Sequence, residues 1–212
     1  MNDISLRQEL IRVCQRLDAL GFVAATDGNV SARLSKDAIL ITPSMEAKGG
    51  LEPEQLLVVG MDGKVRAGAG RPSSEMKMHL AVYWLRPDVN AVVHAHPPVA
   101  TGFASSGLDL TEPVLPEMVL TVGAVPLAPY ATPSTEEVPR SIERLVAKYN
   151  AVLLANHGVL ALGKDLTEAL HRMERVEHLA KVVLVGKLAG NLKVLDKEEM
   201  GKLKELAKQM GV

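Results

Sequence analysis

Two histidines lie two residues apart at the end of an apolar run, in the segment Val-Val-His-Ala-His-Pro-Pro at 92–98. The β-branched residues before them predict a strand, and side chains two apart on a strand point to the same face. His94 and His96 could therefore bind one ligand together. A third histidine, His157, ends a second apolar run at 151–157, directly before Gly158, where the chain is expected to turn.

Three imidazoles with one open position form a familiar arrangement for catalytic zinc, because zinc accepts nitrogen ligands in tetrahedral geometry. The residues alone leave two interpretations open: a metal site built from the three histidines, or unrelated structural histidines at strand ends. His79 is a rival ligand on an expected helix, although it could equally fill a half-buried helix face. His171 and His178 fall on a charge-rich helix, which is typical of a solvated surface.

A second group of polar residues falls in expected turns and at an expected helix start. Backbone N–H groups and hydroxyls at such places can bind the oxygen atoms of an anion. Ordinary capping and turn formation explain each short stretch by itself. Only their combination indicates an anion site. The residues concerned are Gly28, Asn29, Thr42, Ser44, Ser73 and Ser74.

The elements that must position these residues are mixed helices and strands, with no internal repeat and no linker. We expect one α/β domain spanning 1–212. Apolar spacing predicts helices over 6–20, 73–85, 134–148, 166–186 and 197–210, with another turn or two after residue 98. Strands are expected over 29–34, 38–42, 56–59, 91–96, 151–157 and 159–163, and over 118–128 with a turn at Gly123.

Composition excludes several classes of protein. Aromatic residues are 3% of the chain and hydrophobic residues 47%, so we expect a core of Val, Leu, Ala, Ile and Met. The net charge of −1 gives no broad electrostatic footprint for nucleic acid. The single cysteine, Cys14, excludes an intramolecular disulfide. The N-terminus lacks the pattern of a signal peptide and no apolar run is long enough for a membrane span, so we expect a cytoplasmic protein without a membrane partner.

Six segments taken in order resemble the class II aldolase family, which includes sugar-phosphate aldolases and 4-epimerases. The resemblance covers residues 5 to about 185 and implies a three-layer α/β/α fold with a central, largely antiparallel sheet. It also implies a homotetramer with active sites at subunit interfaces. The segments are Asp-Gly-Asn-Val-Ser-Ala-Arg-Leu, Ile-Thr-Pro-Ser, Arg-Pro-Ser-Ser-Glu-Met-Lys-Met-His, Ala-Val-Val-His-Ala-His-Pro-Pro, Val-Pro-Leu-Ala-Pro-Tyr-Ala-Thr-Pro-Ser-Thr and Leu-Leu-Ala-Asn-His-Gly.

The resemblance also implies roles for individual residues. His94, His96 and His157 would bind a divalent metal, usually zinc, with manganese or cobalt as alternatives. Glu75 would act as acid/base and approach the metal, and the six polar residues above would bind the substrate phosphate. The implied reaction is reversible cleavage of a ketose 1-phosphate, of the L-fuculose 1-phosphate type, to dihydroxyacetone phosphate and an aldehyde such as lactaldehyde. It would pass through a metal-stabilised enediolate.

Two departures from the family pattern leave substrate choice open. Met45 stands where the phosphate loop commonly has glycine, so a glycine-specific backbone geometry could be altered. No tyrosine stands where fuculose-type aldolases use one from a neighbouring subunit, and Glu117 is the nearest ionisable group there. Glu117 is therefore either a second acid/base with a raised pKa or a solvated loop residue. The alternatives are a sugar-phosphate 4-epimerase, a dehydratase or decarboxylase on the same fold, and a metal-free interaction domain.

Overall fold

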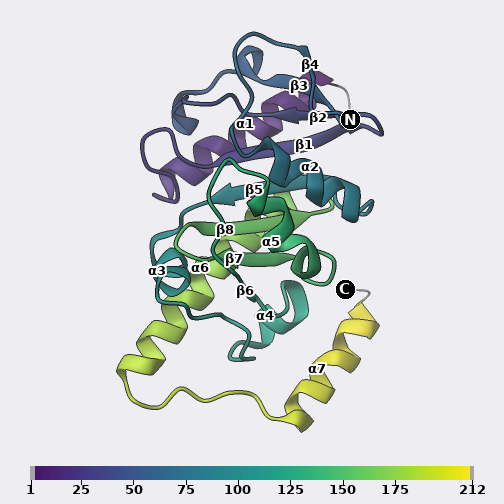
Figure 1. Cartoon of the computed structure of the whole chain (residues 1–212). Helices are drawn as coiled ribbons and strands as arrows, with labels where there is room; N and C mark the ends of the chain where they lie inside the picture. Colours follow the sequence, from purple (N-terminus) through teal and green to yellow (C-terminus); the bar gives the residue numbers. More distant parts are fainter. Residues whose placement is uncertain (1–2, 211–212) are drawn as a thin grey trace.

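Eight strands form one sheet in the computed structural model, which describes residues 3–210. Their order is β4-β3-β2-β1-β5-β8-β7-β6, and every neighbouring pair is antiparallel except β6 and β7. The predicted, largely antiparallel central sheet is therefore confirmed (Figure 1). The strands are β1 (Asn29–Ser35), β2 (Ala38–Ile41), β3 (Leu57–Gly60), β4 (Val65–Ala67), β5 (Ala91–Ala95), β6 (Leu127–Ala128), β7 (Ala151–Leu154) and β8 (Gly158–Gly163).

Helices cover both faces of this sheet, which gives the three layers that the family resemblance implied (Figure 1). Two helices pack on one face, α2 (Met76–Leu85) and α5 (Glu137–Val146). The other face is covered by α1 (Asp3–Ala19), α3 (Pro98–Ser105) and α6 (Leu166–Leu188). The remaining helical elements are η1 (Lys48–Gly50), η2 (Pro53–Gln55), α4 (Pro116–Thr121) and α7 (Lys197–Met210), of which α7 contacts α4.

Alternation along the strands divides the aliphatic core between the two faces. On β5, Val92 packs in the cluster that contains Met78 of α2 and Ile142 of α5. Its neighbour Val93 packs in the opposite cluster with Met173 of α6. His94 lies two residues after Val92, and side chains two apart on a strand share a face. The first histidine of the pair therefore lies on the α2 side of the sheet.

The segment 118–128 was predicted to be mostly strand, and that prediction is wrong for its first half. Residues 116–121 form α4, and only Leu127–Ala128 pair as a strand. Pro116 occupies the first turn of the helix, where its missing N–H costs nothing. The Val122 N–H donates to the Met118 carbonyl oxygen over 3.0 Å, four residues earlier, which is the hydrogen-bond pattern of a helix.

Several predicted boundaries change by a few residues, and two of these changes lie next to the site. β7 ends at Leu154, so His157 lies in the turn before β8 and not on the strand. Asn156 in this turn has φ of 56°, a left-handed conformation that Asn tolerates better than most residues. The helix expected from Ser73 begins at Met76 with Glu75 as its N-cap residue, so Ser73 belongs to the preceding turn.

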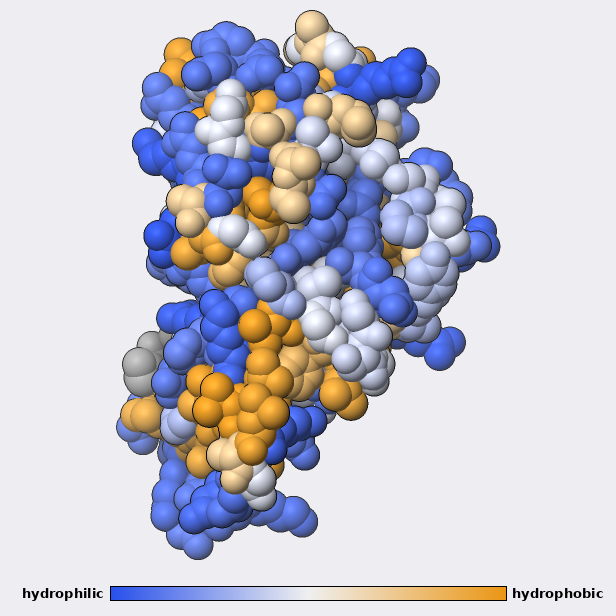
Figure 2. Space-filling view, turned by 90° about the vertical axis from the view of Figure 1, so that its left-hand side faces the viewer, coloured by the Kyte–Doolittle hydropathy of each residue, from blue (hydrophilic) through white to orange (hydrophobic). Residues whose placement is uncertain are grey.

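One face of the molecule carries a gathering of apolar side chains, in the lower half of Figure 2. The C-terminal part of α6 has several exposed apolar residues and ends near the loop that follows α3. No helix within residues 3–210 has the length and apolar character needed to cross a membrane. The exposed apolar residues of α6 and its surroundings are Leu108, Leu184, Val185, Leu188 and Val194.

Candidate active site

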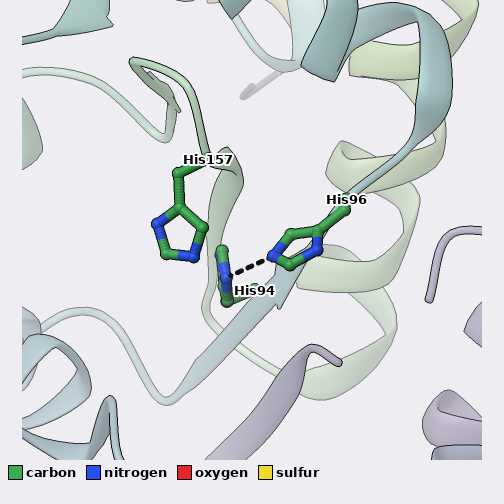
Figure 3. A group of neighbouring side chains, drawn as sticks. All are labelled: His94, His96 and His157. Atoms are coloured by element: carbon green, nitrogen blue, oxygen red, sulfur yellow. Dashed lines mark hydrogen bonds between the residues drawn. The ribbon is translucent and has the colours of Figure 1, made fainter. Parts of the chain in front are cut away.

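Three central strands bring the histidines together (Figure 3). His94 lies on β5, paired with Asn29 of β1 on one side and Leu160 of β8 on the other. His96 follows the end of β5, where its backbone N–H donates to the Phe22 carbonyl oxygen over 2.8 Å. His157 enters from the turn between β7 and β8. One ring nitrogen from each histidine lies within 4.8 Å of the others.

The absence of a side chain at Gly158 allows this convergence. A Cβ atom there would lie 2.5 Å from His96 Cδ2 and 2.6 Å from the Ala95 carbonyl oxygen. Such contacts are far closer than carbon atoms tolerate. The glycine was expected for its turning ability, but the structure requires it for close approach of the imidazoles.

The protonation of His94 is constrained by its surroundings. Its Nδ1 lies 2.9 Å from the Val159 carbonyl oxygen, so in the neutral ring Nδ1 is the donor and Nε2 carries the lone pair. That Nε2 lies 3.1 Å from Nε2 of His96. Burial alone would lower the pKa of His94, but the charge of Glu75 and a hydrogen bond with it raise the pKa overall.

The other two rings are held in the neutral form at neutral pH. Burial, followed by the charge of His94, lowers the pKa of His96 to about 4 and that of His157 to about 4. A neutral imidazole presents a lone pair at one nitrogen, which is the form that binds metals. His96 Nδ1 also lies 3.5 Å from an Asp27 carboxylate oxygen, a neighbour that the sequence did not indicate.

Glu75 is the buried carboxylate that faces the cluster, with 8% of its surface exposed. Its Oε2 accepts a hydrogen bond from Asn29 Nδ2 over 2.9 Å and lies 3.1 Å from His94 Nε2. Its Oε1 lies 3.4 Å from His157 Nε2 and has no hydrogen-bond partner in the described part of the chain. Burial would raise the pKa of Glu75, but the charge and hydrogen bond of His94 hold it well below its usual range.

His79 is not a fourth member of the cluster. Its Nε2 faces Asn29 Oδ1 at 2.5 Å, and its Nδ1 faces Ser31 Oγ at 2.6 Å, so both nitrogens are engaged. Ser31 in turn lies 2.8 Å from the Tyr83 hydroxyl. This network was not predicted, although the spacing of four between residues 75, 79 and 83 and of two between residues 29 and 31 is visible in the sequence.

The loops expected to bind phosphate are joined to one another. An isolated bridge pairs Pro43 with Pro72, and the Ser73 N–H donates to the Thr42 carbonyl oxygen over 3.1 Å. The Ser44 N–H donates to the Arg71 carbonyl oxygen. The 42–44 and 71–74 loops therefore lie side by side.

Each polar residue of this group has its own surroundings. Ser74 is exposed and Ser44 half-buried, whereas the Thr42 hydroxyl is buried and accepts from the Val30 N–H. The Ser73 hydroxyl accepts from the Glu75 N–H. The Asn29 side chain is bonded to Glu75 and His79, and Gly28 has φ of 73° with the His94 carbonyl 3.0 Å from where its Cβ would be.

A buried lysine that was not among the sequence candidates links the loop before Gly28 to the segment that follows the 42–45 turn. Lys48 is 1% exposed, and its ammonium donates to the Thr26 carbonyl oxygen over 2.9 Å and to the Glu46 carbonyl oxygen over 2.5 Å. Thr26 precedes Gly28, and Glu46 follows the 42–45 turn. Burial lowers the pKa of Lys48, while the neighbouring Cys14 and carboxylates act in the opposite direction.

Met45 adopts a backbone conformation that glycine reaches without steric cost. Its φ is 63°, in the left-handed region. Keeping a side chain with a Cβ in this region costs on the order of 1–2 kcal/mol. The Met45 side chain itself is exposed, so the strain lies in the backbone.

The structure does not bring the other sequence candidates to the cluster. Glu117 is exposed in the first turn of α4 and, within residues 3–210, makes no contact with the three histidines. His171 and His178 are exposed on α6, as the charge pattern predicted. Cys14 is buried, and this burial raises the pKa of its thiol to about 12, which is a structural environment.

Comparison with known proteins gives consistent matches over most of the chain. The model of the class II aldolase and adducin N-terminal domain matches residues 8–184. The 3-oxo-tetronate 4-phosphate decarboxylase of Escherichia coli (strain K12) is 36% identical over 185 residues, which are 85% of this chain and 87% of that protein. The L-fuculose phosphate aldolase of Haemophilus influenzae is 36% identical over 206 residues, 94% of this chain and 92% of that one. A solved structure of an L-fuculose 1-phosphate aldolase superposes with a TM-score of 0.91 at 32% identity, covering 100% of this chain and 99% of that one.

Proposed function

Because the chain belongs to the family of class II aldolases and adducins, we propose that it is a zinc-dependent aldehyde-lyase acting on a ketose 1-phosphate. It cleaves a substrate of the L-fuculose 1-phosphate type reversibly to dihydroxyacetone phosphate and an aldehyde such as lactaldehyde. The observation that carries this proposal is the convergence of three imidazole nitrogens within 4.8 Å beside a buried carboxylate.

The donor set fits a divalent ion. Two ring nitrogens 3.1 Å apart, on His94 and His96, need a proton or a cation between them. His157 supplies a third neutral ring, and three imidazoles leave one position open for substrate. Zinc is the proposed ion, with manganese or cobalt as alternatives. When bound, it would supply Lewis-acid stabilisation for the negative charge that develops on the substrate carbonyl oxygen.

Glu75 is the proposed acid/base. Cleavage breaks the bond between C3 and C4 of the ketose and leaves its electrons on the dihydroxyacetone phosphate half as an enediolate. A proton must then reach C3. In the cleavage direction Glu75 must first carry a proton, which it would deliver to C3 from Oε1, the oxygen that faces the cluster and has no hydrogen-bond partner within residues 3–210. The ionised carboxylate is also the form that takes a proton from C3 in the reverse reaction.

The polar loops have a positioning role. We propose that Gly28, Asn29, Thr42, Ser44, Ser73 and Ser74 form the phosphate site, mainly through backbone N–H groups and the Ser74 and Ser44 hydroxyls. Lys48 links the 26–29 loop to residue 46, and backbone hydrogen bonds link 42–44 to 71–73, which supports a fixed cradle. A fixed phosphate orients the reacting carbons without taking part in bond making.

Aldol cleavage also requires a group that removes the proton of the C4 hydroxyl. We propose Glu117 for this role, supplied by a neighbouring subunit, because it is exposed and contacts none of the histidines of its own chain. Exposed apolar residues at the end of α6 support association into the homotetramer that this role requires (Figure 2). Light scattering should give four times the 22.7 kDa of the chain, and a stable monomer would contradict this assignment.

A decarboxylase acting on a phosphorylated 3-oxo acid is the second candidate, favoured by 36% identity to the Escherichia coli enzyme. Loss of carbon dioxide from 3-oxo-tetronate 4-phosphate leaves the same enediolate of dihydroxyacetone phosphate that aldol cleavage leaves. The same Glu75 proton transfer completes both reactions. Only the aldolase needs a base for a hydroxyl proton, so Glu117 is dispensable to a decarboxylase.

A paired assay separates the two candidates. Zinc-loaded protein is incubated with dihydroxyacetone phosphate and lactaldehyde, and in parallel with 3-oxo-tetronate 4-phosphate. Formation of a ketose phosphate supports the aldolase, and formation of dihydroxyacetone phosphate from the oxo acid alone supports the decarboxylase. Chelator and His94→Ala should abolish the activity, while His171→Ala on the exposed face of α6 serves as the matched control. No activity and no stoichiometric metal would contradict both and leave the interaction domain.

A further inference from the structure

A ladder of polar residues lies between β1 and α2. Glu75, His79 and Tyr83 recur every four residues and so occupy one face of the helix region. Asn29 and Ser31 alternate along β1 on the face that meets them. Four hydrogen bonds connect the five side chains in a single line, from the Tyr83 hydroxyl to the Glu75 carboxylate. All five side chains are buried.

The ionised carboxylate of Glu75 at one end of the ladder determines which group donates in each of its hydrogen bonds. An ionised carboxylate only accepts, so the Asn29 amide must turn its NH₂ group toward Glu75 and its Oδ1 toward His79. His79 Nε2 must then be the donor. In a neutral ring Nδ1 is therefore the acceptor, and it takes the Ser31 hydroxyl hydrogen. The oxygen of Ser31 is left to accept from Tyr83.

The neutrality of His79 has an independent cause. The ring is 0% exposed, and burial, followed by the positive charge of His94, lowers the pKa of His79 to about 3. Glu75 opposes this shift without reversing it. A neutral ring has one donor and one acceptor nitrogen, so the ladder is consistent only with hydrogen on Nε2.

We propose that His79 is a positioning residue for Glu75, which it orients through the Asn29 amide by holding that amide in one of its two flip states. Asn29 then clamps Glu75 Oε2, and Oε1 is left as the oxygen that moves the proton. The catalytic consequence rests on the proposed lyase function of Glu75. The orientation of Asn29 and the tautomer of His79 do not depend on that function. Without the Nε2 donor, only the ionised carboxylate holds the amide, and Asn29 can turn its oxygen to Glu75 whenever Glu75 carries the proton that it transfers.

The tautomer gives a test that does not depend on activity. Zinc-loaded protein labelled with nitrogen-15 in histidine should show His79 with hydrogen on Nε2 and a bare Nδ1, and His79→Gln assigns the signals. Tyr83→Phe should shift the His79 Nδ1 signal because Ser31 loses its donor, but should leave the tautomer unchanged. Hydrogen on Nδ1, or a protonated ring at neutral pH, would overturn the proposal.

Kinetics test the positioning role. Gln can donate an N–H close to the place of Nε2, whereas Asn places its amide close to Nδ1. His79→Gln should therefore retain most of kcat, and His79→Asn should lose about tenfold or more with KM within about twofold, because a small misplacement of an acid/base is costly. His79→Leu should resemble the Asn variant, and His178→Leu, exposed on α6, is the matched control.

The outcomes distinguish the positioning role of His79 from the lyase function of Glu75. Equal kcat in the Gln and Asn variants, or a loss that follows KM or zinc content, overturns the positioning role. If the wild-type protein cleaves neither substrate while the predicted tautomer is found, the lyase function fails and the orientation of the ladder stands. If the Leu variant does not fold, the Gln and Asn pair still decides.

Discussion

Asn29 Nδ2 donates to Glu75 Oε2 over 2.9 Å, and this hydrogen bond joins the first residue of β1 to the residue that opens α2. The two residues are 46 positions apart in the chain. The bond fixes one carboxylate oxygen beside the histidines, and the other has no hydrogen-bond partner among the described residues. An amide expected to bind phosphate is therefore engaged with the acid/base.

Replacing Asn29 with aspartate should test this pairing directly. Asn29→Asp removes the NH₂ donor and puts a second carboxylate about 3 Å from Glu75. Like charges at this distance raise the pKa of one carboxyl. We expect kcat to fall about tenfold or more and the pH–rate profile to shift to higher pH. Asn191→Asp, exposed beyond the end of α6, is the control. An unchanged profile would argue against the role of Asn29.

Replacing Gly158 with alanine should disrupt the histidine cluster. The added Cβ would meet His96 Cδ2 at 2.5 Å and backbone oxygen at 2.6 Å, so the strands or the ring must move. We expect zinc stoichiometry measured by elemental analysis to fall well below one per chain, with a loss of about 1–3 kcal/mol in unfolding free energy. Gly201→Ala, on α7 with open space around it, should instead stabilise the chain slightly. Full zinc content in the Gly158 variant would contradict the packing argument.

Acid should destabilise the metal-free protein in a way that depends on His79. The pKa of folded His79 is about 3, below the ordinary 6.5, so the unfolded chain binds a proton that the folded chain does not. This contribution is fully present above pH 6.5 and is lost as pH falls toward 3, by about 1.4 kcal/mol per pH unit for one group. Urea unfolding between pH 7 and pH 4 measures the slope.

His79→Gln should make the dependence of the unfolding free energy on pH shallower by the contribution of one bound proton. The variant can be less stable at every pH, but the slope is read independently of the absolute stability. His178→Gln on α6 should leave it unchanged. Identical slopes for the wild type and the His79 variant would show that His79 is not held neutral by burial.

The left-handed backbone at Met45 predicts a gain in stability from glycine. Met45→Gly removes the steric cost of φ at 63° and should stabilise the fold by about 1 kcal/mol, less the entropy that glycine loses on folding. Ala47→Gly, at φ of −66°, should destabilise because no such strain is relieved. Thermal unfolding measures both. A lower Tm for Met45→Gly would show that the methionine side chain contributes more than its backbone costs.

The sequence allowed the central sheet and the histidine cluster to be predicted, with specific failures. His94 and His96 were placed together by strand periodicity, and their ring nitrogens do face each other at 3.1 Å. The prediction of a strand over 118–122 was wrong because the spacing of apolar residues in a short run does not distinguish a helix from a strand. Pro116 at the first position of α4 was the available signal for a helix.

The polar ladder could be read from spacing only in part. Residues 75, 79 and 83 share a helical face and residues 29 and 31 a strand face, but spacing does not say which face meets which. That depends on the sheet order, which puts β1 beside β5 and under α2. Lys48 was missed because a lysine is almost never fully buried, so nothing marked it as a link between loops.

The order of strands in the sheet also has a consequence for folding kinetics. Asn29, His94 and Leu160 are neighbours across β1, β5 and β8, although they come from distant parts of the chain. Non-local pairing of this kind forms slowly because loop closure precedes any gain in contacts. The complete set of nitrogen donors therefore exists only after the middle of the sheet has closed. During refolding, the rate at which zinc is taken up in a stable form should report the pairing of β5 with β8.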